Sequence, residues 1–287
     1  MMPTPSTALT ACHLLDTGYC LAHESTMIQG GRRVQVACHA LVALLHHPNH
    51  GWILWDTGYA PHMMTETARL PYRLYRWATP LHIDPKLAVA AQLARFGLQP
   101  SSISTIIISH FHADHIAGLR DFPTARFVAT EAAYDHFVAR TGLAALRCGY
   151  LPALLPPDFA ARATLLPPFT GPVIPYLGAS HDLLGDGSLR LVDLPGHARG
   201  QMGLLAHTGH GDDFFVADGA WLSRAIREER PPARATRLIV DDWRAVQRTL
   251  VNLHAFAQAH PTWRLIPTHC PEVFARAVFA RAVEQPA

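Results

Sequence analysis

Four side chains that can bind metal ions stand together in the segment His110-Phe-His-Ala-Asp-His. The β-branched run at residues 105–108 precedes them and is typical of a strand buried on both faces. In an extended segment His110 and His112 point the same way, and Asp114 and His115 follow as the chain turns. Imidazole and carboxylate ligands without cysteine favour Zn²⁺, with Mn²⁺ or iron as alternatives. The cluster therefore predicts a metal site at a strand end, with enough ligands for two ions.

A solvated histidine-rich loop is the alternative interpretation, because 19 histidines in 287 residues make chance pairs common. Chance does not readily place His-x-His-x-Asp-His directly after an apolar strand, so the metal site is favoured. The segment resembles the signature of the metallo-β-lactamase fold hydrolases. This resemblance extends from about Thr17 to His269.

Predicted strands alternate with predicted helices, which indicates an α/β fold. The predicted strands are 34–46, 52–55, 105–108, 125–129, 181–184, 189–194, 203–207, 214–217 and 263–267. The predicted helices are 84–97, 130–140 and 242–259. The resemblance implies an αββα sandwich, in which two mixed β-sheets face each other with helices outside and the site lies where strand-end loops meet. We expect residues 1–287 to form one domain.

The resemblance also assigns roles to residues beyond the first cluster. It implies that Asp56, in an Asp-Thr-Gly turn, orients a ligand imidazole, and that Asp218 bridges two metals. His197 of a Pro-Gly-His segment and His269 would complete the ligand set. One metal would be held by His110, His112 and His197, and the other by Asp114, His115 and His269.

Several residues near these positions are expected to have no part in metal binding. Asp212 and Asp213 are alternatives to Asp218, but they are predicted in a turn and are expected to behave as surface residues. Cys270 is a potential soft ligand beside His269, although adjacent strand residues point to opposite faces. Four histidines on the predicted hairpin are expected to be bystanders: His39, His46, His47 and His50.

The resemblance implies a dinuclear hydrolase in which a hydroxide bridging the metals attacks a carbonyl carbon while Asp114 carries the proton to the leaving group. The segments Gly18-Tyr-Cys and His23-Glu-Ser resemble the opening of the N-acyl homoserine lactone lactonases. Trp221, a candidate catalytic residue, stands where those lactonases place a tyrosine whose hydroxyl can assist the developing oxyanion; an indole N–H can also donate there but is larger and differently aimed. Acyl homoserine lactone-like molecules are therefore the predicted substrates.

Three other functions are compatible with the sequence. The first is hydrolysis of another small ester or thioester, as in glyoxalase II, which requires a basic cluster that the sequence alone does not single out. The second is a redox member with a single iron. The third is a non-catalytic metal-binding effector. Metal content and a substrate panel distinguish them.

Two apolar inserts, at about 60–82 and 142–175, are expected either to cap the active site or only to pack beside it. Prolines in the second insert exclude long regular elements there. The candidate contacts for an acyl tail are Met63, Met64, Trp77, Phe159, Phe169 and Trp221.

Composition narrows the remaining classes. A formal net charge of +2, with 16% charged residues, is far from the basic surface of a nucleic-acid-binding protein. No stretch is apolar and long enough to span a membrane, and residues 1–20 do not resemble a signal peptide. Five cysteines without CxxC spacing predict free thiols in the cytoplasm. The expected partner is a small-molecule substrate, with a homodimer as one possible assembly.

Overall fold

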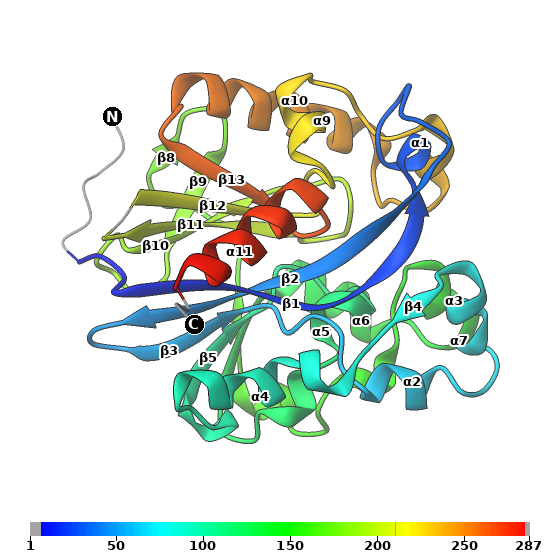
Figure 1. Cartoon of the computed structure of the whole chain (residues 1–287), viewed down its shortest axis with the longest axis horizontal. Helices are drawn as coiled ribbons and strands as arrows, with labels where there is room; N and C mark the ends of the chain where they lie inside the picture. Colours follow the sequence, from blue (N-terminus) through cyan, green and yellow to red (C-terminus); the bar gives the residue numbers. More distant parts are fainter. Residues whose placement is uncertain (1–6, 210, 285–287) are drawn as a thin grey trace.

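Two mixed β-sheets face each other, with helices on their outer faces, in the computed structural model, which describes residues 7–209 and 211–284 (Figure 1). The first sheet contains, in spatial order, β4 (Leu81–His82), β1 (Ala11–His23), β2 (Gln35–His47), β3 (Gly51–Trp55), β5 (Ile103–Ile107), β6 (Arg126–Thr130) and β7 (Ala163–Leu166). The second contains β13 (Trp263–Pro267), β12 (Gly211–Ala217), β11 (Met202–Thr208), β10 (Leu189–Asp193), β9 (Gly178–Asp182) and β8 (Val173–Ile174). The predicted αββα sandwich is confirmed.

Strand direction changes within each sheet. Strands β1, β2 and β3 are antiparallel, whereas β3, β5, β6 and β7 run parallel. In the second sheet β8 to β12 are antiparallel and β13 is parallel to β12. The parallel strands β3 and β5 end at the same edge, which is where the histidine cluster begins.

Successive side chains of a strand point to opposite faces of the sheet, and the strands therefore contribute to three separate apolar cores. Ile106 packs between the first sheet and its helices, whereas Ile107 packs between the two sheets. In β10, Leu191 faces the space between the sheets and Val192 faces α9 and α10. Because both faces of these strands are buried at these positions, neighbouring residues of each strand are both apolar.

The helices are mostly short. They are α1 (Glu24–Met27), α2 (His62–Glu66), α3 (Arg73–Ala78), α4 (Val89–Gln92), α5 (Ala113–Ile116), α6 (Glu131–Val138), α7 (Gly142–Arg147), α8 (Phe159–Arg162), α9 (Ser223–Arg227), α10 (Trp243–Ala259) and α11 (Pro271–Glu284). The 3-10 turns are η1 (Pro85–Leu87), η2 (Leu93–Phe96), η3 (Pro100–Ser102), η4 (Leu119–Asp121), η5 (Pro152–Leu154) and η6 (Arg234–Leu238).

Side-chain caps explain where the predicted helices begin. Thr130 accepts a hydrogen bond from the Ala133 N–H at the start of α6, and Asp242 accepts two at the start of α10. The predicted helix at 84–97 is instead divided into η1, α4 and η2. Ala88 adopts an extended ψ of 138°, which interrupts the helical hydrogen bonds.

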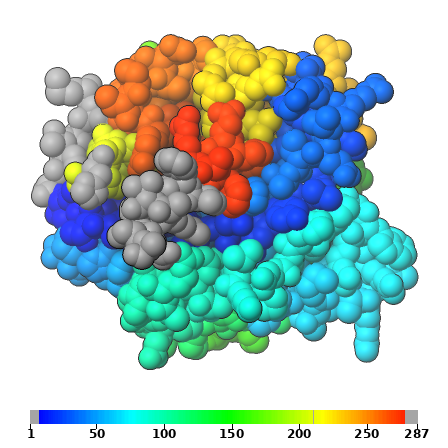
Figure 2. All heavy atoms as spheres, in the orientation of Figure 1, coloured from blue at the N-terminus to red at the C-terminus, as the bar shows by residue number. Residues whose placement is uncertain are grey.

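The sequence did not reveal three features of the fold. Strand β1, of 13 residues, pairs along β2. Insert 142–175 contributes the edge strands β7 and β8, one to each sheet. The start of α11 lies across β1 and β2 (Figures 1 and 2), where the Phe274 ring stacks on His39 with centroids 3.6 Å apart.

A hydrogen-bonded carboxylate joins the two sheets at one end. Asp186, in the turn between β9 and β10, contacts His47 Nε2 at 2.8 Å and accepts the Ser188 N–H and hydroxyl. Burial raises the pKa of Asp186, but the hydrogen bonds from Ser188 and His47 outweigh it and lower the pKa to about 2. His47 therefore has a structural contact of its own. No helix in the described residues is both long and apolar enough to cross a membrane.

Candidate metal centre

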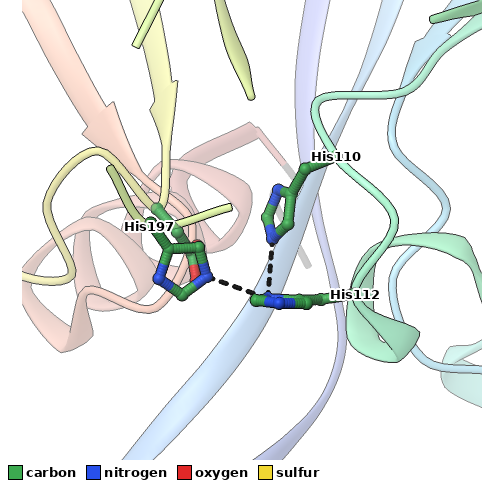
Figure 3. Close-up of side chains that lie close together, drawn as sticks. His110, His112 and His197 are labelled. Atoms are coloured by element: carbon green, nitrogen blue, oxygen red, sulfur yellow. Dashed lines mark hydrogen bonds and ion pairs between the residues drawn. The ribbon is translucent and has the colours of Figure 1, made fainter. Parts of the chain in front are cut away.

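Three histidines converge on one point (Figure 3). His112 Nδ1 lies 3.1 Å from His110 Nε2 and 2.9 Å from His197 Nε2. Two imidazole nitrogens on one tetrahedral Zn²⁺ lie about 3.3 Å apart, so this spacing suits a shared cation. Asp218 Oδ2 is 3.1 Å from His197 Nε2, and donor atoms of the four residues lie within 4.8 Å of one another.

A second group, Asp114, His115 and His269, lies beside the first with its donor atoms also within 4.8 Å. His269 Nε2 is 3.5 Å from Asp114 Oδ2. Asp218 contacts this group as well, through Oδ2 at 3.2 Å from His269 Nε2 and Oδ1 at 3.4 Å from His115 Nε2. The structure thus brings all seven predicted ligands together, with Asp218 between the two groups.

These side chains come from segments that are far apart in the sequence. His110 and His112 follow β5, Asp114 and His115 lie in α5, and the other three follow strands β10, β12 and β13. The loop before His197 is held close to α10. Gly196 has a φ of 126°, and a Cβ there would lie 2.2 Å from the Val246 nitrogen. Only glycine fits that approach, which fixes the position of the imidazole.

The imidazole rings of His115 and His269 are oriented by contacts at Nδ1, the ring nitrogen that points away from the site. Asp56 Oδ2 lies 2.8 Å from His115 Nδ1, and Asp56 also accepts the Ser109 N–H at 2.8 Å and hydroxyl at 2.7 Å. His269 Nδ1 donates to the His39 carbonyl at 2.7 Å. Each contact places the N–H on Nδ1 and directs the Nε2 lone pair into the site.

Asp56 was predicted from its Asp-Thr-Gly turn, whereas Ser109 and His39 were missed. Ser109 directly precedes the cluster, and that position was the available signal. His39 was treated as a bystander because of its side chain, whereas its backbone oxygen makes the contact. Sequence carries no signal for such a carbonyl.

Burial and mutual contact shift the ionisation of several of these side chains. Burial, with neighbouring imidazoles, holds the pKa values of His110, His112 and His197 below their usual range. Burial also lowers the pKa of His269, but Asp218 and Asp114 outweigh it and raise the pKa to about 9. Burial raises the pKa of Asp218, yet the surrounding imidazoles bring it well below its usual range. The three neutral imidazoles and the Asp218 carboxylate are in the forms that bind cations.

Two buried atoms in the centre have no hydrogen-bond partner within the described part of the chain: His115 Nε2 and Asp218 Oδ1. Buried polar atoms are normally hydrogen-bonded, because an unsatisfied one costs about 1–3 kcal/mol. Both atoms belong to the candidate ligand set and face each other. A divalent cation coordinated by both would satisfy them, so the residues fit a metal site.

Trp221 lies at the centre, but its indole N–H donates to Asp218 Oδ2 at 3.0 Å. The donor therefore already has an acceptor, and this geometry favours positioning of Asp218 over the predicted contact with an oxyanion. Cys270 is buried and its Sγ accepts from the Ser223 N–H at 3.3 Å, outside both ligand groups.

The expectation that Asp212 and Asp213 lie in a turn was wrong, because both belong to β12. Asp213 is fully buried and forms two hydrogen bonds of 2.6 and 2.7 Å with Arg264. Asp212 contacts His207 Nδ1 at 2.8 Å. Both aspartates have structural partners away from the candidate ligands.

Three of the six predicted acyl-tail contacts were also wrong, because these side chains lie in the apolar cores. Met63 and Phe159 are fully buried core residues, and Phe169 packs between the sheets. Met64 and Trp77 are exposed at 38% and 65%. These apolar side chains are divided between core and surface, which composition does not distinguish.

A cleft of about 330 Å³ opens beside His112 and His197. Insert 142–175 contributes Arg147, Cys148 and Tyr150 to its wall. Other segments supply the rest of the wall, and the full lining is His112, His136, Arg147, Cys148, Tyr150, His197, Ala198, Arg199, Arg237, Leu238, Ile239, Val240 and Asp241.

Comparison with known proteins identifies the family. Residues 35–257 match the metallo-beta-lactamase superfamily. N-acyl homoserine lactonase AttM of Rhizobium radiobacter is 24% identical over 208 residues, 70% of either chain. Probable metallo-hydrolase Rv2300c of Mycobacterium tuberculosis is 26% identical over 254 residues, covering 84% of this chain and 77% of the relative.

A solved structure of an N-acyl homoserine lactone hydrolase, with the product N-hexanoyl-L-homoserine bound at the catalytic metal center, has a TM-score of 0.74. The match covers 94% of this chain and 96% of that one at 16% identity, so it supports the fold. The family match extends over most of the chain, including six of the seven candidate ligands. The chain therefore belongs to the metallo-β-lactamase superfamily and is a metal-dependent hydrolase.

Proposed function

We propose that the protein is a dinuclear-metal hydrolase that opens lactone rings, with acyl homoserine lactone-like molecules as substrates. The observation that carries this proposal is the position of Asp218 between two groups of ligands. His110, His112 and His197 would hold one ion, and Asp114, His115 and His269 the other. Asp218 would bind both, and Zn²⁺ suits these donors best.

Two bound divalent ions would lower the pKa of a shared water from 15.7 toward about 7 and polarise the substrate carbonyl. The chain supplies the proton transfer. The Asp114 side chain is 15% exposed, compared with 4% for Asp218 and 7% for His269. As the more accessible carboxylate, Asp114 would take the proton and deliver it to the leaving oxygen.

The lactone assignment is supported by the similarity to lactonase AttM and by the surface near the cleft. Leu238 and Ile239 in the cleft wall are 68% and 57% exposed, so an acyl chain has apolar side chains to cover. Each buried methylene contributes about 0.8 kcal/mol. Two added carbons should therefore raise kcat/KM roughly tenfold until these side chains are covered.

One observation favours a second candidate, an ester or thioester hydrolase similar to glyoxalase II. Such an enzyme needs basic residues near the metals, and the cleft wall contains Arg147, Arg199 and Arg237. They were not recognised in the sequence because they come from three separate segments. The same metal centre would serve either substrate class.

A substrate panel tests the lactone assignment. Zinc-reconstituted protein would be assayed with N-acyl homoserine lactones of increasing chain length, aryl esters and thioesters, with release of acid followed by titration. We expect lactone hydrolysis that increases with chain length. Inert lactones of every length, alongside turnover of aryl esters or thioesters, would show that the second candidate is correct.

A further inference from the structure

Three arginines lie around the cleft beside His112 and His197. Arg147 ends α7, Arg199 is two residues after His197, and Arg237 lies in η6. We infer that this cleft binds a carboxylate on the acyl part of the substrate, so that the enzyme prefers lactones or esters of dicarboxylic acids. The inference deepens the proposed function and rests on it.

The charges in the cleft wall are unbalanced. Arg199 Nε is paired with Asp241 Oδ2 at 3.3 Å. Within the described residues, no carboxylate lies within ion-pair distance of Arg147 or Arg237. Asp241 is the one acidic residue in the wall, so two guanidinium groups have no counter-charge there.

An exposed arginine often contacts only solvent. Arg147 and Arg237 differ from such surface groups in their position in the wall of a cleft. A concave wall with charges of one sign focuses the electrostatic potential and concentrates ions of the opposite sign. The guanidinium group also matches a carboxylate with two parallel hydrogen bonds. Here the unpaired cations border the cleft that the two candidate metal ligands also line.

The remaining wall residues indicate what connects the reacting carbonyl to the anion. Leu238, Ile239 and Val240 form an aliphatic part of the same wall. Arg237 directly precedes them in the chain. A substrate with its carbonyl at the metal centre, a short aliphatic chain and a terminal carboxylate would find side chains suited to each of these parts in the cleft wall.

Two matched substrates test this inference: N-succinyl homoserine lactone and N-succinamoyl homoserine lactone, in which a neutral amide replaces the carboxylate. We expect the wild-type enzyme to prefer the carboxylate by roughly tenfold in kcat/KM, mainly through KM. Arg147→Gln and Arg237→Gln should each reduce the preference about threefold, and the double variant should remove it. The readout is the ratio of kcat/KM between the two lactones, so a variant that lowers kcat/KM equally for both would contradict the role of its arginine.

Arg126→Gln is the matched control, since Arg126 is exposed at the opposite end of the parallel strands, where β6 begins. It should leave the preference unchanged. Raising the ionic strength should weaken the preference of the wild-type enzyme and not that of the double variant. Equal kcat/KM values for the two lactones in the wild-type enzyme would overturn the inference while leaving the lactonase proposal intact.

If neither lactone is hydrolysed, the proposed function fails and binding decides the inference. The ring-opened products, N-succinyl homoserine and N-succinamoyl homoserine, differ only in the tail group. Calorimetric titration should show tighter binding of the N-succinyl product by the wild-type protein and equal binding by the double variant. Equal affinities in the wild-type protein would overturn the carboxylate site.

Discussion

Replacing Asp56 with asparagine should weaken metal binding at His115 without a change in shape. Asp56 is buried, with a φ of 59°, a backbone conformation that asparagine adopts readily. Its carboxylate accepts hydrogen bonds from Ser109 and contacts His115 Nδ1. An amide NH₂ in place of Oδ2 would face Nδ1 with a donor, so the imidazole proton would move to Nε2, the atom needed for the metal.

The size of the effect follows from those contacts. Losing a hydrogen-bonding partner behind a metal-binding histidine typically costs about 10- to 100-fold in metal affinity. That range corresponds to about 1.4–2.7 kcal/mol. In the asparagine variant the hydrogen bond from the Ser109 N–H to Oδ1 would remain, whereas the contacts of Oδ2 with the Ser109 hydroxyl and His115 Nδ1 would be lost. We therefore also expect the free energy of unfolding of the metal-free protein to fall by about 2–3 kcal/mol.

Zinc affinity would be measured by competition with a chromogenic chelator, together with elemental analysis after dialysis. Asp121→Asn is the control, because Asp121 makes the same kind of contact with His62, at 2.6 Å, outside both ligand groups. The control should retain wild-type affinity for both ions. Wild-type affinity for both ions in Asp56→Asn would refute the orienting role of Asp56.

Three further changes give distinct results. Trp221→Phe removes the hydrogen bond to Asp218, and kcat for lactone hydrolysis should fall by roughly 3- to 30-fold at unchanged metal content; an unchanged kcat would mean that this contact is dispensable. Asp213→Ala leaves Arg264 unpaired, so chemical denaturation should show a loss of about 1–3 kcal/mol with turnover retained. For Asp186→Asn, the low pKa means that the carboxylate stabilises the fold above pH about 4, and this contribution is lost as the pH falls toward 2. The variant should be less stable by about 1 kcal/mol at pH 7, since the site is partly solvated, and the difference should shrink below pH 3 in thermal unfolding.

The parts of the fold and site that were predictable depend on local sequence patterns. The isoleucine run before His110 identified β5, and Asp242 identified the start of α10, because burial and capping leave local signals. His197, Asp218 and His269 could be named because each follows a recognisable strand in a family pattern.

The parts that were missed depend on tertiary contacts. The three cleft arginines are separated by up to 90 positions in the chain (147 to 237), so no local pattern joins them. Buried Asp213 was assigned to a turn because its partner, Arg264, lies on a different strand. Phe159 was assigned to a pocket wall because the residue types that form an apolar core also line apolar pockets, and residue type alone does not separate the two.

Metal content in wild-type protein and Asp218→Ala tests most directly whether one carboxylate joins the two metal sites. Elemental analysis of reconstituted protein should give close to two zinc ions per chain. Asp218→Ala should retain about one ion and lose nearly all lactone turnover, whereas Asp212→Ala should keep both ions. One tightly held iron in the wild-type chain, or two ions retained in Asp218→Ala, would contradict the dinuclear centre.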